Sequence, residues 1–153
     1  MANVTVRDVV RQIGQCHAAL AALYSGLAAT ASGERVRMLA QALAAREDRL
    51  VQTTARYQRD EASKPTLDYW FKAKPIMPEA LSLDGVQLDP QMTTDELSAF
   101  GVGCDAALGE FVQRISEATN SLKVQELFAD LRAQQEAEVR QTARVTLSVE
   151  RDL

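Results

Sequence analysis

The side chains most able to do chemistry in this chain are one imidazole and several carboxylates that interrupt apolar helical patterns. They are His17, Glu47, Asp105 and Glu138, with the amide of Gln135 one turn before Glu138. Imidazole nitrogen and carboxylate oxygen together suit zinc, iron or manganese. A metal ion bound by the four ionisable side chains is therefore one function that the pattern predicts.

Two other interpretations of these side chains stay open. Carboxylates in an apolar interior must be paired or protonated, because a lone buried charge costs several kcal/mol. A hydrogen-bonded network would meet that need, with a cation reaching inward from Arg46, Arg49, Arg114 or Arg132. Alternatively, Val139 replaces Glu138 on the apolar face and leaves the acid in water. We expect the network, with His17 as a satisfied core histidine and no firm metal ligand.

Four amphipathic helices must position this polar layer. Apolar residues recur three or four residues apart over 5–57 and again over 93–146, and each stretch is broken once, at 32–33 and at 120–121. Each stretch predicts an antiparallel helical hairpin. Residues after Val145 are expected to fray.

Helix starts are marked by short polar residues. Thr5 with Asp8 and Thr93 with Glu96 predict capping boxes at the two hairpin starts. Ser32 predicts the cap of the second helix. The remaining charges of the second and fourth helices are expected to lie on a solvated face: Arg46, Asp48, Arg49, Arg132, Glu136 and Arg140.

The two hairpins match each other in sequence at an offset of 104 − 16 = 88 residues. Cys16-His17-Ala18-Ala19-Leu20 corresponds to Cys104-Asp105-Ala106-Ala107-Leu108, and 54–56 to 142–144. Such an internal repeat implies two units whose apolar faces need each other. Cys16 and Cys104 stand beside the polar layer. We expect small apolar fillers there, with a disulfide or a soft-metal contact as the alternative.

Between the hairpins, 58–92 is a different kind of sequence. It holds all four prolines and the only tryptophan, in Tyr69-Trp70-Phe71, and it is too apolar for a free linker. A connection of this length can travel the length of a bundle as a crossover, although long loops also serve as lids. The aromatic cluster is expected to pack on the bundle, with a partner surface as the alternative.

Two helical hairpins joined by a long crossover resemble the ferritin-like superfamily, most closely its rubrerythrin branch, and the run over 124–131 is similar to the start of a second-hairpin helix there. The resemblance implies a di-iron site with ferroxidase or peroxidase chemistry. Its ligands would be one Glu from the first helix of each hairpin and a Glu-x-x-His from the second. These positions hold His17 and Asp105, then Glu47-Asp48-Arg49-Leu50 and Gln135-Glu136-Ala137-Glu138. Only Glu47 is retained, so the resemblance implies a degenerate di-iron site.

Composition narrows the class of protein. The chain has 153 residues, 46% of them hydrophobic, which predicts a single domain over 1–153. A net charge of −4 and no basic patch argue against nucleic acid as a partner. An apolar run of about 20 residues, as a membrane span needs, is missing. The first eight residues do not have the pattern of a signal peptide, so a cytoplasmic location is expected.

The sequence thus predicts an all-α, ferritin-like four-helix bundle that acts as a non-catalytic binding or scaffold protein. We expect a homodimer without a cofactor, whose protein or small-molecule partner the sequence does not name. The alternative is a metal-binding ferritin-like protein, either a di-iron-type oxidoreductase or a metal store. It would use iron, manganese or zinc at an altered ligand set. A third possibility is a small-molecule binder that uses the space between the hairpins.

Overall fold

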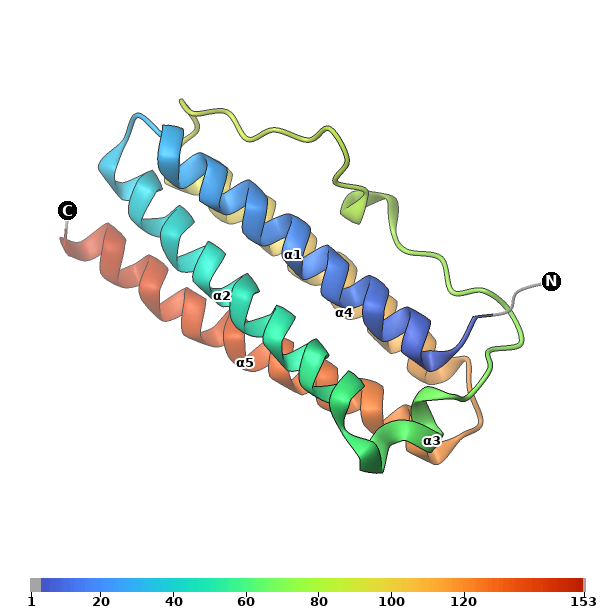
Figure 1. The fold of residues 1–153 in the computed structure, drawn as a ribbon. Coiled ribbons are helices and arrows are strands. Elements are labelled where there is room, and N and C mark those ends of the chain that lie inside the picture. The colour runs from blue at the N-terminus through green and yellow to red at the C-terminus, as the bar shows by residue number, and fades with distance from the viewer. Residues whose placement is uncertain (1–3, 153) are drawn as a thin grey trace.

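Four long helices pack side by side along most of the molecule (Figure 1). The computed structural model describes the backbone of residues 4–152 and the side chains of residues 4–148. The long helices are α1 (Val6–Thr30), α2 (Glu34–Arg59), α4 (Thr94–Glu117) and α5 (Leu122–Asp152). Residues 1–3, which begin the segment that lacks a signal-peptide pattern, lie outside the described part. The described part is helical and contains no strand.

Both predicted capping boxes are confirmed. The Asp8 amide donates to Thr5 Oγ1 at 3.2 Å, and the Thr5 amide donates to Asp8 Oδ2 at 3.0 Å. Thr93 and Glu96 exchange the same two hydrogen bonds, at 3.1 and 3.0 Å. Each box satisfies amide groups that the first turn of a helix leaves without a partner. The starts of α1 and α4 are therefore fixed by local sequence.

Two predicted helix ends are wrong. Gly33, rather than Ser32, is the N-cap of α2. Ser32 is held by the segment before α4 instead, because its amide donates to the Pro90 carbonyl at 3.0 Å and its hydroxyl accepts from Gln91 at 2.7 Å. At the other end of the chain, α5 continues past Val145 to Asp152. That stretch contains neither glycine nor proline, so nothing in it stops a helix.

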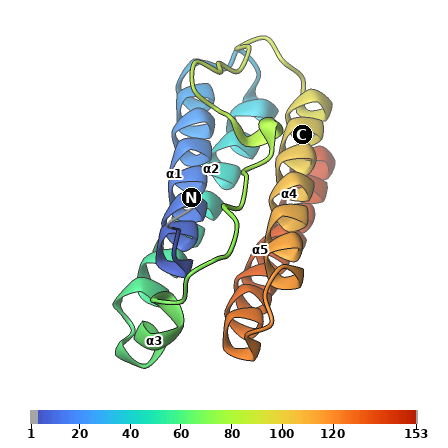
Figure 2. The same cartoon turned by 90° about the vertical axis from the view of Figure 1, so that its right-hand side faces the viewer.

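The connection between α2 and α4 runs the length of α1. It contains short helices at Glu61–Ser63 (η1), Lys64–Leu67 (α3) and Glu79–Leu81 (η2). Near the start of α1, the Val6 amide donates to the Tyr69 carbonyl at 2.9 Å. Near its end, the Ser32 amide donates to Pro90. The connection passes over the face between α1 and α4, so α4 begins beside the α1–α2 loop (Figure 2).

The aromatic cluster of this connection is split between packing and exposure. Phe71 is buried, and its ring lies 6.4 Å from that of Phe128. Tyr69 packs edge-on to Phe71, and its hydroxyl accepts from Thr119 Oγ1 at 3.1 Å. Trp70, in contrast, is 59% exposed. The expected packing on the bundle therefore holds for two of the three rings.

The core follows the predicted apolar stripes. Its largest fully buried apolar side chains come from all four long helices and from α3: Leu20, Tyr24, Leu39, Leu67, Leu97, Phe111 and Phe128. Among the described residues, no helix combines the length and apolar character that crossing a membrane requires. Helix packing alone accounts for the polar layer's position, because the stripes turn the same helix faces inward.

Candidate functional site

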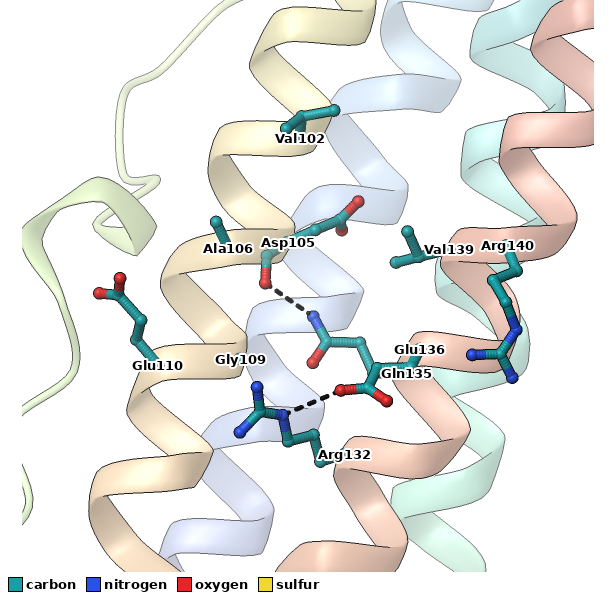
Figure 3. A pocket seen from close by; sticks show the side chains of 10 residues that line it. All are labelled: Val102, Asp105, Ala106, Gly109, Glu110, Arg132, Gln135, Glu136, Val139 and Arg140. Carbon is teal, nitrogen blue, oxygen red and sulfur yellow. Dashed lines mark hydrogen bonds and ion pairs between the residues drawn. The ribbon is translucent and has the colours of Figure 1, made fainter.

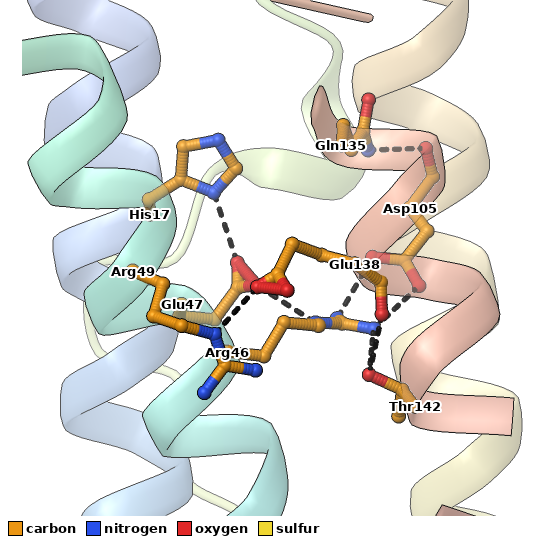
Figure 4. A network of polar contacts seen from close by, with 8 residues as sticks. All are labelled: His17, Arg46, Glu47, Arg49, Asp105, Gln135, Glu138 and Thr142. Atoms are coloured by element: carbon orange, nitrogen blue, oxygen red, sulfur yellow. Dashed lines mark hydrogen bonds and ion pairs between the residues drawn. The ribbon is translucent and has the colours of Figure 1, made fainter. Parts of the chain in front are cut away.

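The polar layer predicted from the sequence exists, and it crosses the middle of the bundle (Figure 4). α1 contributes His17, α2 contributes Arg46 and Glu47, and α4 contributes Asp105. α5 supplies Gln135. All but Asp105 are at most 6% exposed, and the Asp105 side chain is 16% exposed.

Glu47 is saturated by its two neighbours. Its Oε1 lies 3.0 Å from His17 Nδ1, and its Oε2 accepts from Arg46 Nε at 3.0 Å. Both contacts are fully enclosed by protein, where hydrogen bonds to charged groups are strongest. Neither oxygen of this carboxylate faces open space.

Arg46 joins the two halves of the molecule. Its Nη2 and Nη1 donate to Asp105 Oδ1 and Oδ2 at 2.9 and 3.2 Å, a two-point contact that suits a planar guanidinium. Nη1 also lies 3.4 Å from Thr142 Oγ1. Burial lowers the pKa of Arg46, but the carboxylates of Asp105 and Glu47 raise it by more, so the side chain stays charged. The expectation that Arg46 lies on a solvated face is wrong, since it is 2% exposed.

Asp105 is held from two sides. Burial raises its pKa, Arg46 opposes that shift, and Glu47 adds to it, with a raised pKa as the result. Gln135 Nε2 donates to the Asp105 backbone carbonyl at 3.1 Å and links α5 to α4. Gln135 therefore contacts the backbone of Asp105 and not its carboxylate, which accepts hydrogen bonds from Arg46 instead.

Glu138 lies apart from the other candidate ligands. Its Oε2 accepts from Arg49 Nε at 2.7 Å at the edge of the bundle, where Arg49 is 54% exposed. Of the four arginines considered for the layer, Arg46 enters it and Arg49 borders it. Arg114 pairs with Glu110 and Arg132 with Glu136, at 3.7 and 3.0 Å on the outer surface.

This donor set does not fit the two metal ions that the family resemblance implies. The oxygens of Glu47 and Asp105 are already engaged by Arg46 or His17, and a fixed positive charge lies between the two carboxylates. A metal ion would need the same oxygens and would meet the repulsion of the guanidinium. Within the described residues, no cluster of three His, Cys, Asp or Glu side chains is arranged to hold a metal ion.

Both cysteines are buried and free, so the disulfide alternative does not apply. Burial raises the pKa of Cys16 to about 12 and that of Cys104 to about 11, and nearby carboxylates add to the shift. The thiolate is the reactive form of cysteine. The two side chains therefore act as small neutral fillers at neutral pH.

A buried hydroxyl was missed by the sequence analysis. The Tyr24 ring is fully buried, and its hydroxyl has no hydrogen-bond partner among the described residues. The oxygen would lie 3.5 Å from a Cβ at Gly101. Burial raises the pKa of Tyr24, with Arg46 opposing the shift. Its place in an apolar stripe predicted burial but gave no sign that the hydroxyl would be unpaired.

A groove that was not predicted from the sequence lies between α4 and α5, with a volume of about 520 Å³ (Figure 3). Small apolar residues line it: Val102, Ala106, Gly109 and Val139. Charges of both signs surround them: Glu110, Arg132, Glu136 and Arg140. The signal was present, because Val102, Ala106 and Gly109 lie three or four residues apart on one face of α4.

Comparison with known proteins identifies no relative of this chain. No family model, curated protein or solved structure matches this chain.

Proposed function

We propose that this chain is a non-catalytic, ferritin-like four-helix bundle with a degenerate di-metal site, which works as a binding or scaffold protein. The observation that carries the proposal is the guanidinium of Arg46, placed between Glu47 and Asp105. A cation supplied by the chain occupies the position where such bundles hold metal ions.

Electrostatics favour this interpretation over an altered metal site. Two carboxylates and one guanidinium in the same layer leave a single negative charge, shared with the His17 imidazole. Removing one partner of such a buried set leaves an uncompensated charge at a cost of about 3–5 kcal/mol. The network thus pairs the carboxylates of Glu47 and Asp105 without a ligand.

Metal loading tests the proposal. Protein purified without chelator would be incubated with Fe²⁺, Mn²⁺ or Zn²⁺, desalted and assayed for bound metal by mass spectrometry. We expect no metal that depends on the layer, and equal residual metal in the wild type, in Glu47→Ala and in the exposed control Glu110→Ala. Stoichiometric metal that disappears in Glu47→Ala alone would overturn the proposal in favour of the metal-binding alternative.

The first partner that we propose is a second copy of the chain, bound at the α4–α5 groove. The groove has a small apolar floor, on which Val102 is 65% exposed, and a rim with both signs of charge. A two-fold interface brings the same patch of two copies together, so a patch with both signs can pair with itself. Arg140 has no ion-pair partner among the described residues. In a dimer it would share Glu110 or Glu136 of the other copy with the arginine that each already contacts, Arg114 or Arg132.

Light scattering coupled to size exclusion tests the dimer at micromolar concentration. We expect a dimer for the wild type, a monomer for Val102→Arg, and a dimer for the control Ile76→Arg, which places the same charge on an exposed apolar residue outside the groove. A monomeric wild type would remove the dimer from the proposal and leave the metal result untouched.

A further inference from the structure

A second cavity lies between the connection and the carboxyl-terminal half of α4, away from the polar layer. Its volume is about 340 Å³, within the range of small-ligand sites. Phe71, Phe111 and Ile115, each at most 5% exposed, form its apolar floor. Pro75 and Ile76 close one side, and Ile76 is itself 80% exposed. The cavity therefore places an exposed apolar side chain, Ile76, beside a floor of buried apolar side chains.

The floor of this cavity is anchored. The Phe71 amide donates to the Val4 carbonyl at 2.9 Å, and the Phe71 ring packs near Phe128. The nearby Tyr69 hydroxyl accepts a hydrogen bond from Thr119 in the α4–α5 loop. These contacts tie the connection to the segment before α1, to the α4–α5 loop and to α5. A cavity held in this way needs little reorganisation to receive a ligand.

The rim of the cavity is positively charged. Lys72, Lys74 and Arg114 line it, and no lining residue is acidic. The chain has only four lysines and a net charge of −4, yet two of the lysines lie here. Lys72 and Lys74 have no ion-pair partner among the described residues, whereas Arg114 pairs with Glu110 at 3.7 Å. A cationic rim on an acidic protein selects for an anion.

One local effect opposes anion binding, and it is the smaller one. The last turn of α4 ends at Glu117, beside the cavity, and a helix carboxyl end carries about half a negative charge. The two unpaired ammonium groups of Lys72 and Lys74 outweigh it. The site therefore keeps a positive potential over an apolar floor.

From this arrangement we propose that the cavity binds a single-chain anionic amphiphile of the fatty-acid class, with its carboxylate at Lys72 and Lys74 and its hydrocarbon tail on Phe71, Phe111 and Ile115. The ligand adds to the binding role proposed above at a different site, so metal in the polar layer and fatty acid in this cavity are measured independently. The polar layer around Arg46 takes no part in this site.

Insertion of this loop into a membrane is the competing explanation of an exposed Trp70 and Ile76 beside two lysines. The depth of the cavity favours a ligand that enters the protein, because the floor residues are buried and cannot themselves enter a bilayer. A membrane surface would use the exposed side chains and would not need the floor.

Calorimetric titration with laurate below its micellar concentration tests the proposal, with Trp70 fluorescence as a second readout. We expect one laurate per chain and roughly fivefold to tenfold weaker binding in Lys72→Gln/Lys74→Gln, because each exposed charge pair contributes modestly. Lys64→Gln/Lys123→Gln removes the same charge elsewhere and should bind as the wild type does. Ala118→Leu fills the cavity and should abolish saturable binding, while circular dichroism checks that it stays folded.

Several outcomes would overturn the proposal. They are no saturable laurate binding, equal affinity in the two lysine pairs, unchanged binding in a folded Ala118→Leu, or equal affinity for dodecyltrimethylammonium, which has the same tail and a cationic head. Sedimentation with phosphatidylglycerol vesicles in the absence of laurate binding would assign the segment to a membrane surface instead.

Discussion

The two halves of the bundle, α1–α2 and α4–α5, pair their buried polar side chains in different ways. His17 and Glu47 in α1–α2 stand at positions that correspond, 88 residues later, to Asp105 and Gln135 in α4–α5. In the first half the two side chains contact each other at 3.0 Å. In the second half, Gln135 bonds to the backbone of Asp105 and leaves its carboxylate facing Arg46.

This difference makes the halves depend on each other. Arg46 of α2 contacts Glu47 in its own hairpin and Asp105 in the other hairpin. Asp105 of α4 has no ion-pair partner within α4–α5 among the described residues. The position that matches Arg46 in α5 is Gln134, which is exposed. Positions 88 residues apart therefore lie in helices of both halves but hold side chains of different chemistry.

The largest effect is expected from Arg46→Met. It leaves the buried carboxylates of Glu47 and Asp105 without their cation, so the free energy of unfolding should fall by about 3–5 kcal/mol. Urea denaturation followed by circular dichroism measures the change. Gln134→Met is the matched control in the other half and should stay within about 0.5 kcal/mol of the wild type. Equal losses in the two variants would contradict the central role of Arg46.

Removing the whole network should restore most of that loss. In His17→Leu/Arg46→Met/Glu47→Leu/Asp105→Leu no charge stays buried, and apolar replacement of buried ion pairs is often neutral or stabilising by about 1–4 kcal/mol. Glu47→Leu/Asp105→Leu, in contrast, strands the Arg46 cation and should be as unstable as Arg46→Met. The same denaturation series measures both. A fourfold variant less stable than the double variant would mean that the network itself stabilises the fold.

The buried thiols, one in each half, predict a loss of stability at alkaline pH. In the unfolded chain a thiol ionises near its ordinary pKa of 9.0, whereas the folded protein holds Cys16 to about 12 and Cys104 to about 11. Folding favours the protonated form, so the stabilisation is complete below pH 9 and is lost as pH rises toward 11 or 12. Between pH 9 and 10 each thiol should account for about 1 kcal/mol.

Single replacements separate the two thiols. Cys16→Ala and Cys104→Ala should each flatten the alkaline decline, measured as the free energy of unfolding against pH. The Cys104 contribution should level off first, because burial raises the pKa of that thiol only to about 11, against about 12 for Cys16. Tyr24 titrates in the same direction in every variant and cancels in the comparison. An unchanged decline in both variants would contradict a contribution from the buried thiols.

The sequence predicts the helices better than the site, for a physical reason. Burial of one helix face imposes a period of 3.6 residues, so stripes such as Val6 to Leu27 and the capping residues Thr5 and Thr93 are readable directly. Which charged side chain turns inward depends on helix spacing instead. Arg46 lies beside the stripe residue Glu47, and its burial is favoured by Asp105 from across the bundle together with Glu47. The α4–α5 groove depends on helix spacing in the same way.

The smallest expected effect compares two helix glycines. Replacing Gly103 in α4 by alanine meets no atom within 4 Å and should stabilise the protein by about 0.5–1 kcal/mol, because alanine loses less conformational freedom in a helix. In α1, a Cβ at Gly14 would lie 2.8 Å from Thr54 Oγ1, which donates to the Val51 carbonyl at 2.8 Å. Moving that hydroxyl gives up a hydrogen bond of about 0.5–1.5 kcal/mol, so Gly14→Ala should show no gain.

Thermal and urea denaturation of the two alanine variants decide whether α1–α2 is the more closely packed pair. In a Thr54→Ala background the obstructing hydroxyl is absent, and Gly14→Ala should then gain as much as Gly103→Ala does. If Gly14→Ala stabilises the unmodified chain equally well, the close approach of α1 and α2 at Thr54 imposes no constraint. The α4–α5 groove would then be the remaining evidence that α1 and α2 pack more closely than α4 and α5.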